Sequence, residues 1–181
     1  MQPMKPDIHA TTVLCVRRQG HVVMVADGQV TLGTTVIKHT ANKLRKINGK
    51  VLTGFAGATA DAFTLLERFE EKLKDYSGNV KRAAVELTKD WRTDRILRRL
   101  EALLLIATDE HLFLLSGTGD VLEPDGDVIA IGSGGNIAQA AAEALCAHTD
   151  MDAESIAKAA MGIAAKTCIY TNDTLRMEKL S

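Results

Sequence analysis

Residues 12–26 read TVLCVRRQGHVVMVA, two apolar runs separated by a short polar stretch. Both runs are rich in β-branched residues, which favour strands. The stretch RRQG at 17–20 ends in a glycine suited to a tight turn. We therefore predict strands at 12–16 and 21–26 joined by a hairpin, so that the fold begins with an antiparallel sheet.

Further strand patterns precede a change of period. They cover 34–37, 43–47 and 50–56, and Asn48-Gly49 marks a hairpin turn. These segments predict a first sheet of about five short strands. Apolar residues then recur at helical spacing in two successive segments. Those residues are Ala62, Leu65, Leu66, Phe69 and Leu73, then Val80, Ala83, Ala84, Leu87 and Trp91.

The second half of the chain repeats this order. Strand patterns return at 103–107, 111–115 and 128–131. Apolar residues at helical spacing follow in two segments, around 137–145 and 156–163. The tail from position 169 reads as extended. Three polar residues stand where helix N-caps are expected. These are Asn79, Asn136 and Asp152.

The order of strands, two helices, strands, two helices decides the predicted fold class. A single sheet would leave an apolar face exposed, whereas two sheets packed face to face, each covered by a helix pair, bury both faces. We predict an α+β fold, a four-layer α-β-β-α sandwich. A three-layer α/β sheet is the alternative, but strict alternation of strands and helices is absent.

Composition narrows the class of protein. The 181 residues favour one domain, and the net charge of −1 gives no sign of a nucleic-acid or membrane-surface partner. No apolar run reaches the roughly 18 residues that span a bilayer. Cys15, Cys146 and Cys168 have no paired spacing, which indicates a reducing, cytoplasmic location. The histidines form no metal-ligand pattern.

Residues 1–10, MQPMKPDIHA, precede the first predicted strand. They lack the apolar stretch of a secretory signal and the Arg/Ser richness of a transit peptide. Two readings stay open: a disordered tail, or a pro-segment that is removed.

Thr11 is chemically notable if the chain is cut before it. A threonine hydroxyl needs a base, and a free α-amine with a pKa near 7.7–8.0 lies on the same residue. A lysine base would need its pKa lowered by roughly three units, at a cost on the order of 4 kcal/mol. The amine is therefore the better proton acceptor, although a threonine that merely begins a strand is the simpler reading.

Four more positions carry candidate chemistry. Asp27 reads as a turn residue, or as the partner that Lys43 needs if that lysine is buried. Gly54 either packs closely or offers its N–H to an oxyanion. Ser133 lies in Gly132-Ser133-Gly134-Gly135, either a tight turn or a hydroxyl assisting a nearby site. A dinucleotide fingerprint would need a third glycine where Ile137 stands.

Taken together, these segments resemble one family. The resemblance runs through 11–22, 26–33, 54–57, 59–64, 89–94, 129–135 and 168–172, and it covers almost everything after residue 10. In these segments the chain is similar to the HslV, or ClpQ, family, the proteolytic subunits of HslUV proteases.

The resemblance implies a fold of the N-terminal-nucleophile hydrolase type and a threonine-type endopeptidase. It implies that 1–10 is a pro-segment removed on maturation and that 11–181 is a single peptidase domain. Thr11 matches the nucleophile, Lys43 and Asp27 the active-site pair, Ser133 the accessory serine and Gly54 the oxyanion glycine.

A cation site is also implied by the resemblance. Sodium or a similar ion would be held by main-chain oxygens of Ala165, Cys168 and Thr171. Position 165 is often glycine in the family, so Ala165 is a departure, but carbonyl ligands need no particular side chain. The leader of ten residues is also longer than in many relatives.

The expected partners follow from the same resemblance. The chain would assemble as two stacked hexameric rings and bind an HslU-type AAA+ ATPase hexamer, which unfolds protein substrates. ATP would bind that partner and not this chain. Two other functions stay open: an N-terminal-nucleophile hydrolase acting on small amides, and a silent shell subunit that keeps its pro-segment.

Overall fold

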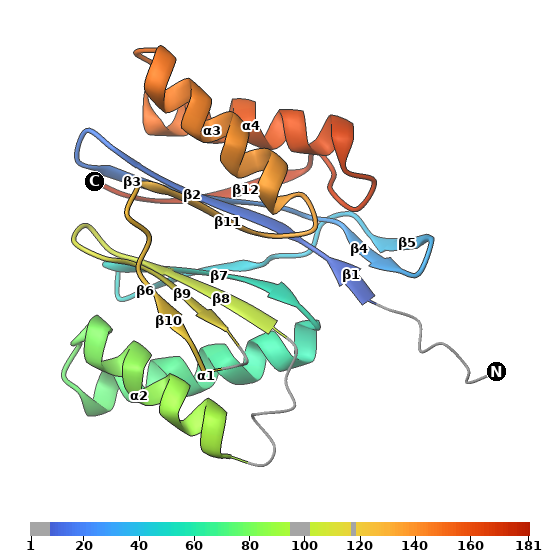
Figure 1. Cartoon of the computed structure of the whole chain (residues 1–181). Helices are drawn as coiled ribbons and strands as arrows, with labels where there is room; N and C mark the ends of the chain where they lie inside the picture. Colours follow the sequence, from blue (N-terminus) through green and yellow to red (C-terminus); the bar gives the residue numbers. More distant parts are fainter. Residues whose placement is uncertain (1–7, 95–101, 117–118) are drawn as a thin grey trace.

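Two sheets lie face to face between two pairs of helices (Figure 1). The structure is a computed structural model that describes residues 8–94, 102–116 and 119–181. Helices α1 (Thr59–Asp75) and α2 (Val80–Thr93) cover one sheet, and α3 (Gly135–His148) and α4 (Ala153–Thr167) cover the other. The predicted four-layer sandwich is confirmed, and the three-layer alternative is wrong.

The first sheet carries the N-terminal hairpin between two strands from the second half of the chain. All neighbouring strands in it are antiparallel. Its order is β11 (Val128–Gly132), β2 (Thr12–Arg18), β3 (His21–Asp27) and β12 (Leu175–Leu180).

The remaining strands form a larger sheet and a small one. The larger is ordered β10 (Val121–Leu122), β9 (Leu112–Ser116), β8 (Ala102–Ala107), β7 (Val51–Gly57) and β6 (Leu44–Ile47). The small sheet is ordered β1 (Ile8–Ala10), β4 (Val30–Leu32) and β5 (Thr35–Lys38).

The prediction of one N-terminal sheet of about five strands is wrong. The early strands are divided among all three sheets, and β1 and β4 were not predicted at all. A hairpin fixes only the pairing between its own two strands, so its outer edges take partners from anywhere in the chain. Here β2 pairs with β11 and β3 with β12.

Burial on both faces explains why β2 and β3 read as continuous apolar runs. In β2, Val13 and Cys15 face the larger sheet, while Leu14 and Val16 pack under α3 and α4. The core between the sheets therefore shares a strand with the core beneath the helices.

Local turn and cap signals decide where several elements begin and end. Gln19-Gly20 and Asn48-Gly49 have positive φ angles at both positions, as two-residue hairpin turns require. The first turn is shorter than the predicted 17–20, because Arg17 and Arg18 belong to β2. Asn79 and Asp152 cap α2 and α4 through their side chains, as predicted.

The predicted cap at Asn136 is wrong, because α3 already begins at Gly135, and Gly134 stands at the cap position. Of the tail predicted to be extended from position 169, Leu175–Leu180 forms strand β12. No helix among the described residues is both long and apolar enough to cross a membrane.

Candidate active site

Four strand ends meet at one end of the first sheet. The register pairs Thr12 with Gly132, and Asp27 with Leu175. The start of β2, the ends of β3 and β11 and the start of β12 are therefore neighbours. Thr11 lies at this meeting point, between β1 and β2.

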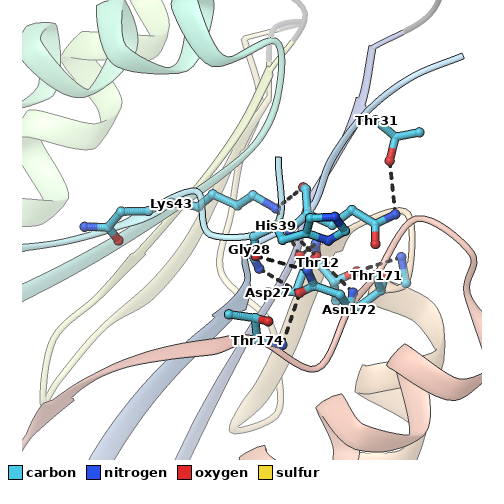
Figure 2. A network of polar contacts seen from close by, with 12 residues as sticks. Thr12, Asp27, Gly28, Thr31, His39, Lys43, Thr171, Asn172 and Thr174 are labelled. Atoms are coloured by element: carbon cyan, nitrogen blue, oxygen red, sulfur yellow. Dashed lines mark hydrogen bonds and ion pairs between the residues drawn. The ribbon is translucent and has the colours of Figure 1, made fainter. Parts of the chain in front are cut away.

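Asp27 organises the site as a fully buried carboxylate (Figure 2). Its Oδ1 accepts from the backbone N–H of Thr12 at 2.7 Å and from Lys43 Nζ at 3.1 Å. Its Oδ2 accepts from the N–H groups of Gln29 at 2.9 Å and Asn172 at 3.2 Å. An ionised carboxylate only accepts hydrogen bonds, so four donors from four parts of the chain satisfy it.

Lys43 lies just before β6, and only 2% of it is exposed. Its Nζ donates to Asp27 and, at 2.7 Å, to the carbonyl of Gln29. Burial lowers the pKa of Lys43, and the charge of Asp27 opposes that effect. The predicted Asp27–Lys43 pair is present, and it places a positive charge beside the start of β2.

Thr11 is held through its main chain while its hydroxyl is not engaged. The peptide that follows it donates to Asp27, and its carbonyl accepts from Ser133 N–H at 3.1 Å. Thr11 Oγ1 is buried and finds no hydrogen-bond partner among the described residues. Its φ of 96° is rare for a β-branched residue, and such outliers cluster at functional sites.

Gly132 makes this arrangement possible. It has a φ of 89°, and a Cβ placed on it would lie 1.7 Å from the carbonyl oxygen of Thr11. Ser133 follows it and contributes its N–H to Thr11, while its side chain is exposed. The predicted glycine-rich turn therefore holds Thr11 by backbone contact, and a part for the Ser133 hydroxyl stays a prediction.

Gly54 lies in the middle of β7, between β6 and β8. It pairs with Leu44 on one side and Leu105 on the other, so its N–H lies within the sheet and does not point out of it. A Cβ here would lie 2.7 Å from Val13 and 2.8 Å from Met24. The oxyanion assignment of Gly54 is therefore corrected: it is a packing glycine between the two sheets.

The loop after α4 joins the site from the far end of the chain. Thr12 Oγ1 lies 2.7 Å from Thr171 Oγ1 and accepts from Gly134 N–H at 2.9 Å. These contacts tie the start of β2 to the N-terminus of α3 and to the loop at 168–172.

Of the three residues expected to hold a cation, Cys168 and Thr171 lie in this loop and Ala165 lies in the last turn of α4. Helix α4 ends at Thr167, and Ala165 is one of the last four residues, whose carbonyls have no partner within the helix. Such carbonyls carry partial negative charge, which suits a cation. Among the described residues no group of three or more His, Cys, Asp and Glu side chains could hold a metal ion, and the cation held by main-chain oxygens stays a prediction.

Comparison with known proteins agrees with this geometry. The family model described as proteasome subunit matches residues 8–180. The ATP-dependent protease subunit HslV of Desulfovibrio desulfuricans is 60% identical over 96% of this chain and 99% of its own length. That of Syntrophobacter fumaroxidans is 59% identical, covering 96% and 97%.

The chain belongs to the HslV family of proteasome-like protease subunits. Among solved structures, eukaryotic HslV from Trypanosoma brucei matches 94% of this chain and 99% of that one, with a TM-score of 0.90 and 48% identity. Thiobacillus denitrificans BPH in complex with Epoxomicin matches 94% and 98%, with a TM-score of 0.74. At 20% identity, that second likeness shows the fold alone.

Membership of the HslV family makes the chain a threonine peptidase of the HslUV type. The structure adds site residues that sequence reasoning did not select. Gly132 was treated only as a turn glycine, and the motif at 168–172 only as a segment of resemblance. The residues added are Thr12, Gln29, Gly132, Thr171 through its side chain, and Asn172.

Proposed function

We propose that cleavage of the Ala10–Thr11 bond turns Thr11 into an N-terminal nucleophile. The observation that carries the proposal is the state of Thr11 before cleavage. Its hydroxyl is buried and finds no hydrogen-bond partner among the described residues, while the peptide N–H that follows Thr11 donates to Asp27, the partner of Lys43. A buried hydroxyl without a hydrogen bond costs about 1–3 kcal/mol, a cost that an adjacent free amine would remove.

Maturation uses the same hydroxyl. Thr11 Oγ1 attacks the carbonyl carbon of Ala10, the Ala10–Thr11 C–N bond breaks, and the amine of Thr11 takes the proton. Water then hydrolyses the ester and releases the leader. The left-handed φ at Thr11 costs on the order of 1–2 kcal/mol, and scission relieves it.

Peptide cleavage then repeats this chemistry on substrate. Thr11 Oγ1 attacks the scissile carbonyl, and its proton moves to the α-amine and from there to the leaving amine. The Lys43 ammonium, fixed by Asp27, favours the neutral amine and the developing alkoxide. Water hydrolyses the acyl-enzyme and restores the hydroxyl.

We propose that the N–H donor to the oxyanion lies at the end of β7 and not at Gly54. Ala56 Cβ lies 3.3 Å from the position of a Cβ on Gly132, so this end of β7 approaches Thr11. Gly57 is the last residue of β7, with a φ of 116°, and it is the second glycine of the segment Gly54-Phe55-Ala56-Gly57. Its N–H is the proposed oxyanion donor. We assign the accessory role near the Thr11 amine to Ser133.

Removal of the leader also opens a strand edge. Strand β1 pairs antiparallel with β4, with Ala10 opposite Val30 and Ile8 opposite Leu32. Once β1 leaves, the edge of β4 is free to pair with an extended peptide. The leader therefore occupies a place where substrate can add a strand.

The cation belongs to this proposal as a structural group. Main-chain oxygens of Ala165, Cys168 and Thr171 would hold sodium or a similar ion and fix the loop that contacts Thr12. Thr171 N–H already donates to Cys168 O at 3.1 Å, and a carbonyl oxygen keeps a second lone pair for an ion.

The assembly and the partner are proposed from the relatives. Two relatives at 60% and 59% identity are named as ATP-dependent protease subunits. We propose two stacked hexameric rings capped by an HslU-type AAA+ ATPase hexamer, which binds ATP and delivers unfolded proteins. Three free cysteines suit a cytoplasmic location, where thiols stay reduced.

Replacement of Thr11 tests the nucleophile. Thr11→Ala is expected to assemble, keep its leader and lose peptide hydrolysis, whereas Thr11→Ser retains part of both activities because a hydroxyl remains. N-terminal mass analysis reports scission, and a fluorogenic peptide with and without the ATPase and ATP reports turnover. Full turnover by Thr11→Ala, or by particles whose every chain keeps its leader, would contradict the proposal.

The same assay separates the other functions left open by the sequence. Rapid cleavage of small amides that is indifferent to the ATPase would indicate a different N-terminal-nucleophile hydrolase. An intact leader on every chain of the inactive, assembled wild-type particle would indicate a silent shell subunit.

A further inference from the structure

The side chain of Asn172 joins three separate segments at the site (Figure 2). Its Oδ1 accepts from the N–H of Gly28 at 3.1 Å and of Thr174 at 3.2 Å. Its Nδ2 donates to the carbonyl of His39 at 3.1 Å. One amide thus connects the loop after α4, the turn after β3 and the segment that leads to Lys43.

The segment at 39–43 is the one that brings Lys43 to Asp27. It lies directly against Gly28, where a Cβ would be 2.2 Å from the carbonyl oxygen of His39. Ala41 N–H also donates to Gly28 O at 2.9 Å. Lys43 follows two residues later. The position of the segment at 39–43 on the turn at Gly28 therefore decides where Lys43 Nζ lies.

The side chain of Asn172 holds these two segments together, although it belongs to neither of them. Its backbone N–H donates to Asp27 while its side chain holds both Gly28 and His39. The residue therefore contacts the partner of Lys43 and the segment that carries Lys43. Asp27 and Lys43 must keep a fixed position relative to Thr11 for their field to act on the amine.

We propose that Asn172 is a positioning residue of the peptidase, which locks the Lys43-bearing segment onto the Asp27–Gly28 turn. The inference rests on the proposed function of Thr11, since Lys43 acts through the amine of that residue. Asn172 is not required to touch substrate. Its loss is expected to slow the chemical step and to leave substrate binding unchanged.

The test compares two variants with a matched control. Asn172→Ala removes all three side-chain bonds, and Asn172→Asp keeps the acceptor for Gly28 and Thr174 but loses the donor to His39. Asn79→Ala is the control, because it removes an asparagine bond to a backbone N–H at the start of α2, at the other helix layer. Each is assayed as full chain with the ATPase and ATP, and rates are normalised to the fraction of chains that begin at Thr11.

Both Asn172 variants are expected to lose kcat on the order of 10- to 100-fold, the scale expected when a catalytic group shifts by about 1 Å. KM for a fluorogenic peptide should stay within about twofold, because the contacts that bind the substrate equally in the ground state and the transition state are not altered. Asn79→Ala should lower thermal stability and keep kcat.

Three outcomes would overturn the inference. They are an unchanged kcat in matured Asn172→Asp, a raised KM with unchanged kcat, and a kcat loss in Asn79→Ala as large as in the Asn172 variants. If Asn172→Ala fails to assemble, Asn172→Asp decides, because it keeps the size and two of the bonds. Failure of the Thr11 proposal is seen separately, as turnover by Thr11→Ala.

Discussion

Replacing Gly132 by alanine tests how closely the end of β11 must approach Thr11. The residue has a φ of 89°, and an L side chain in that left-handed region costs roughly 1–2 kcal/mol. The new methyl would lie 1.7 Å from the carbonyl oxygen of Thr11 and 2.8 Å from its carbonyl carbon. Both obstacles are backbone atoms, which cannot turn aside as a flexible side chain does.

Relief of this overlap requires β11 and Thr11 to separate by roughly 1 Å or more, and overpacking of this kind costs about 1–3 kcal/mol. The free energy of unfolding is therefore expected to fall by roughly 2–5 kcal/mol. A misplacement of about 1 Å at a reacting group lowers rate on the order of 100-fold. Scission at Thr11 and peptide turnover should both slow by that order.

Urea unfolding, N-terminal mass analysis over time and fluorogenic peptide turnover measure the three effects. Gly20→Ala is the matched control, since its φ is 78° but a Cβ there meets nothing within 4 Å among the described residues. It should lose roughly 1–2 kcal/mol of stability and keep its activity. Wild-type scission and turnover by Gly132→Ala would refute the close-approach reasoning.

Two further predictions concern the buried ion pair. Asp27→Asn leaves Lys43 buried without its charged partner and should lower the free energy of unfolding by about 3–5 kcal/mol. The control is Asp127→Asn at the exposed pair with Arg17, which should lower it by less than about 1 kcal/mol. Equal midpoints of urea unfolding for the two variants would contradict this prediction. The lowered pKa of Lys43 means that its ammonium is lost below the usual 10.5, so turnover should fall with rising pH before that value is reached. Between the two pKa values the unfolded state binds more protons, so this residue alone makes stability rise with pH there and fall as pH drops through the folded pKa. An alkaline limb at or above 10.5 in the turnover profile would contradict the assignment.

Local features were predictable because their causes lie within a few residues. The hairpin turns at Gln19-Gly20 and Asn48-Gly49 follow from residues that tolerate positive φ. Asn79 and Asp152 cap the helices that directly follow them. The cap at Asn136 was misplaced because the helix begins two residues earlier than predicted, at Gly135, with Gly134 at the cap position.

The site was predictable only in part. The need for a partner at Lys43 pointed to Asp27, because a buried ammonium is unstable alone. No comparable rule selects Asn172, whose amide acts through backbone groups of Gly28 and His39. The sequence allowed Gly54 either role, and only its pairing inside the sheet separated packing from oxyanion binding.

By itself the amino-acid sequence determined the helices, most of the strands and turns, and the layered architecture, since periodicity and turn chemistry act between neighbours in the chain. Tertiary structure alone decided which strands share a sheet and which residues surround Thr11. The contacts that matter there join Thr12 to Thr171 and Asp27 to Asn172, residues 159 and 145 positions apart. No local rule reaches that far, because such pairs meet only when two packed sheets and their helices bring both ends of the chain together.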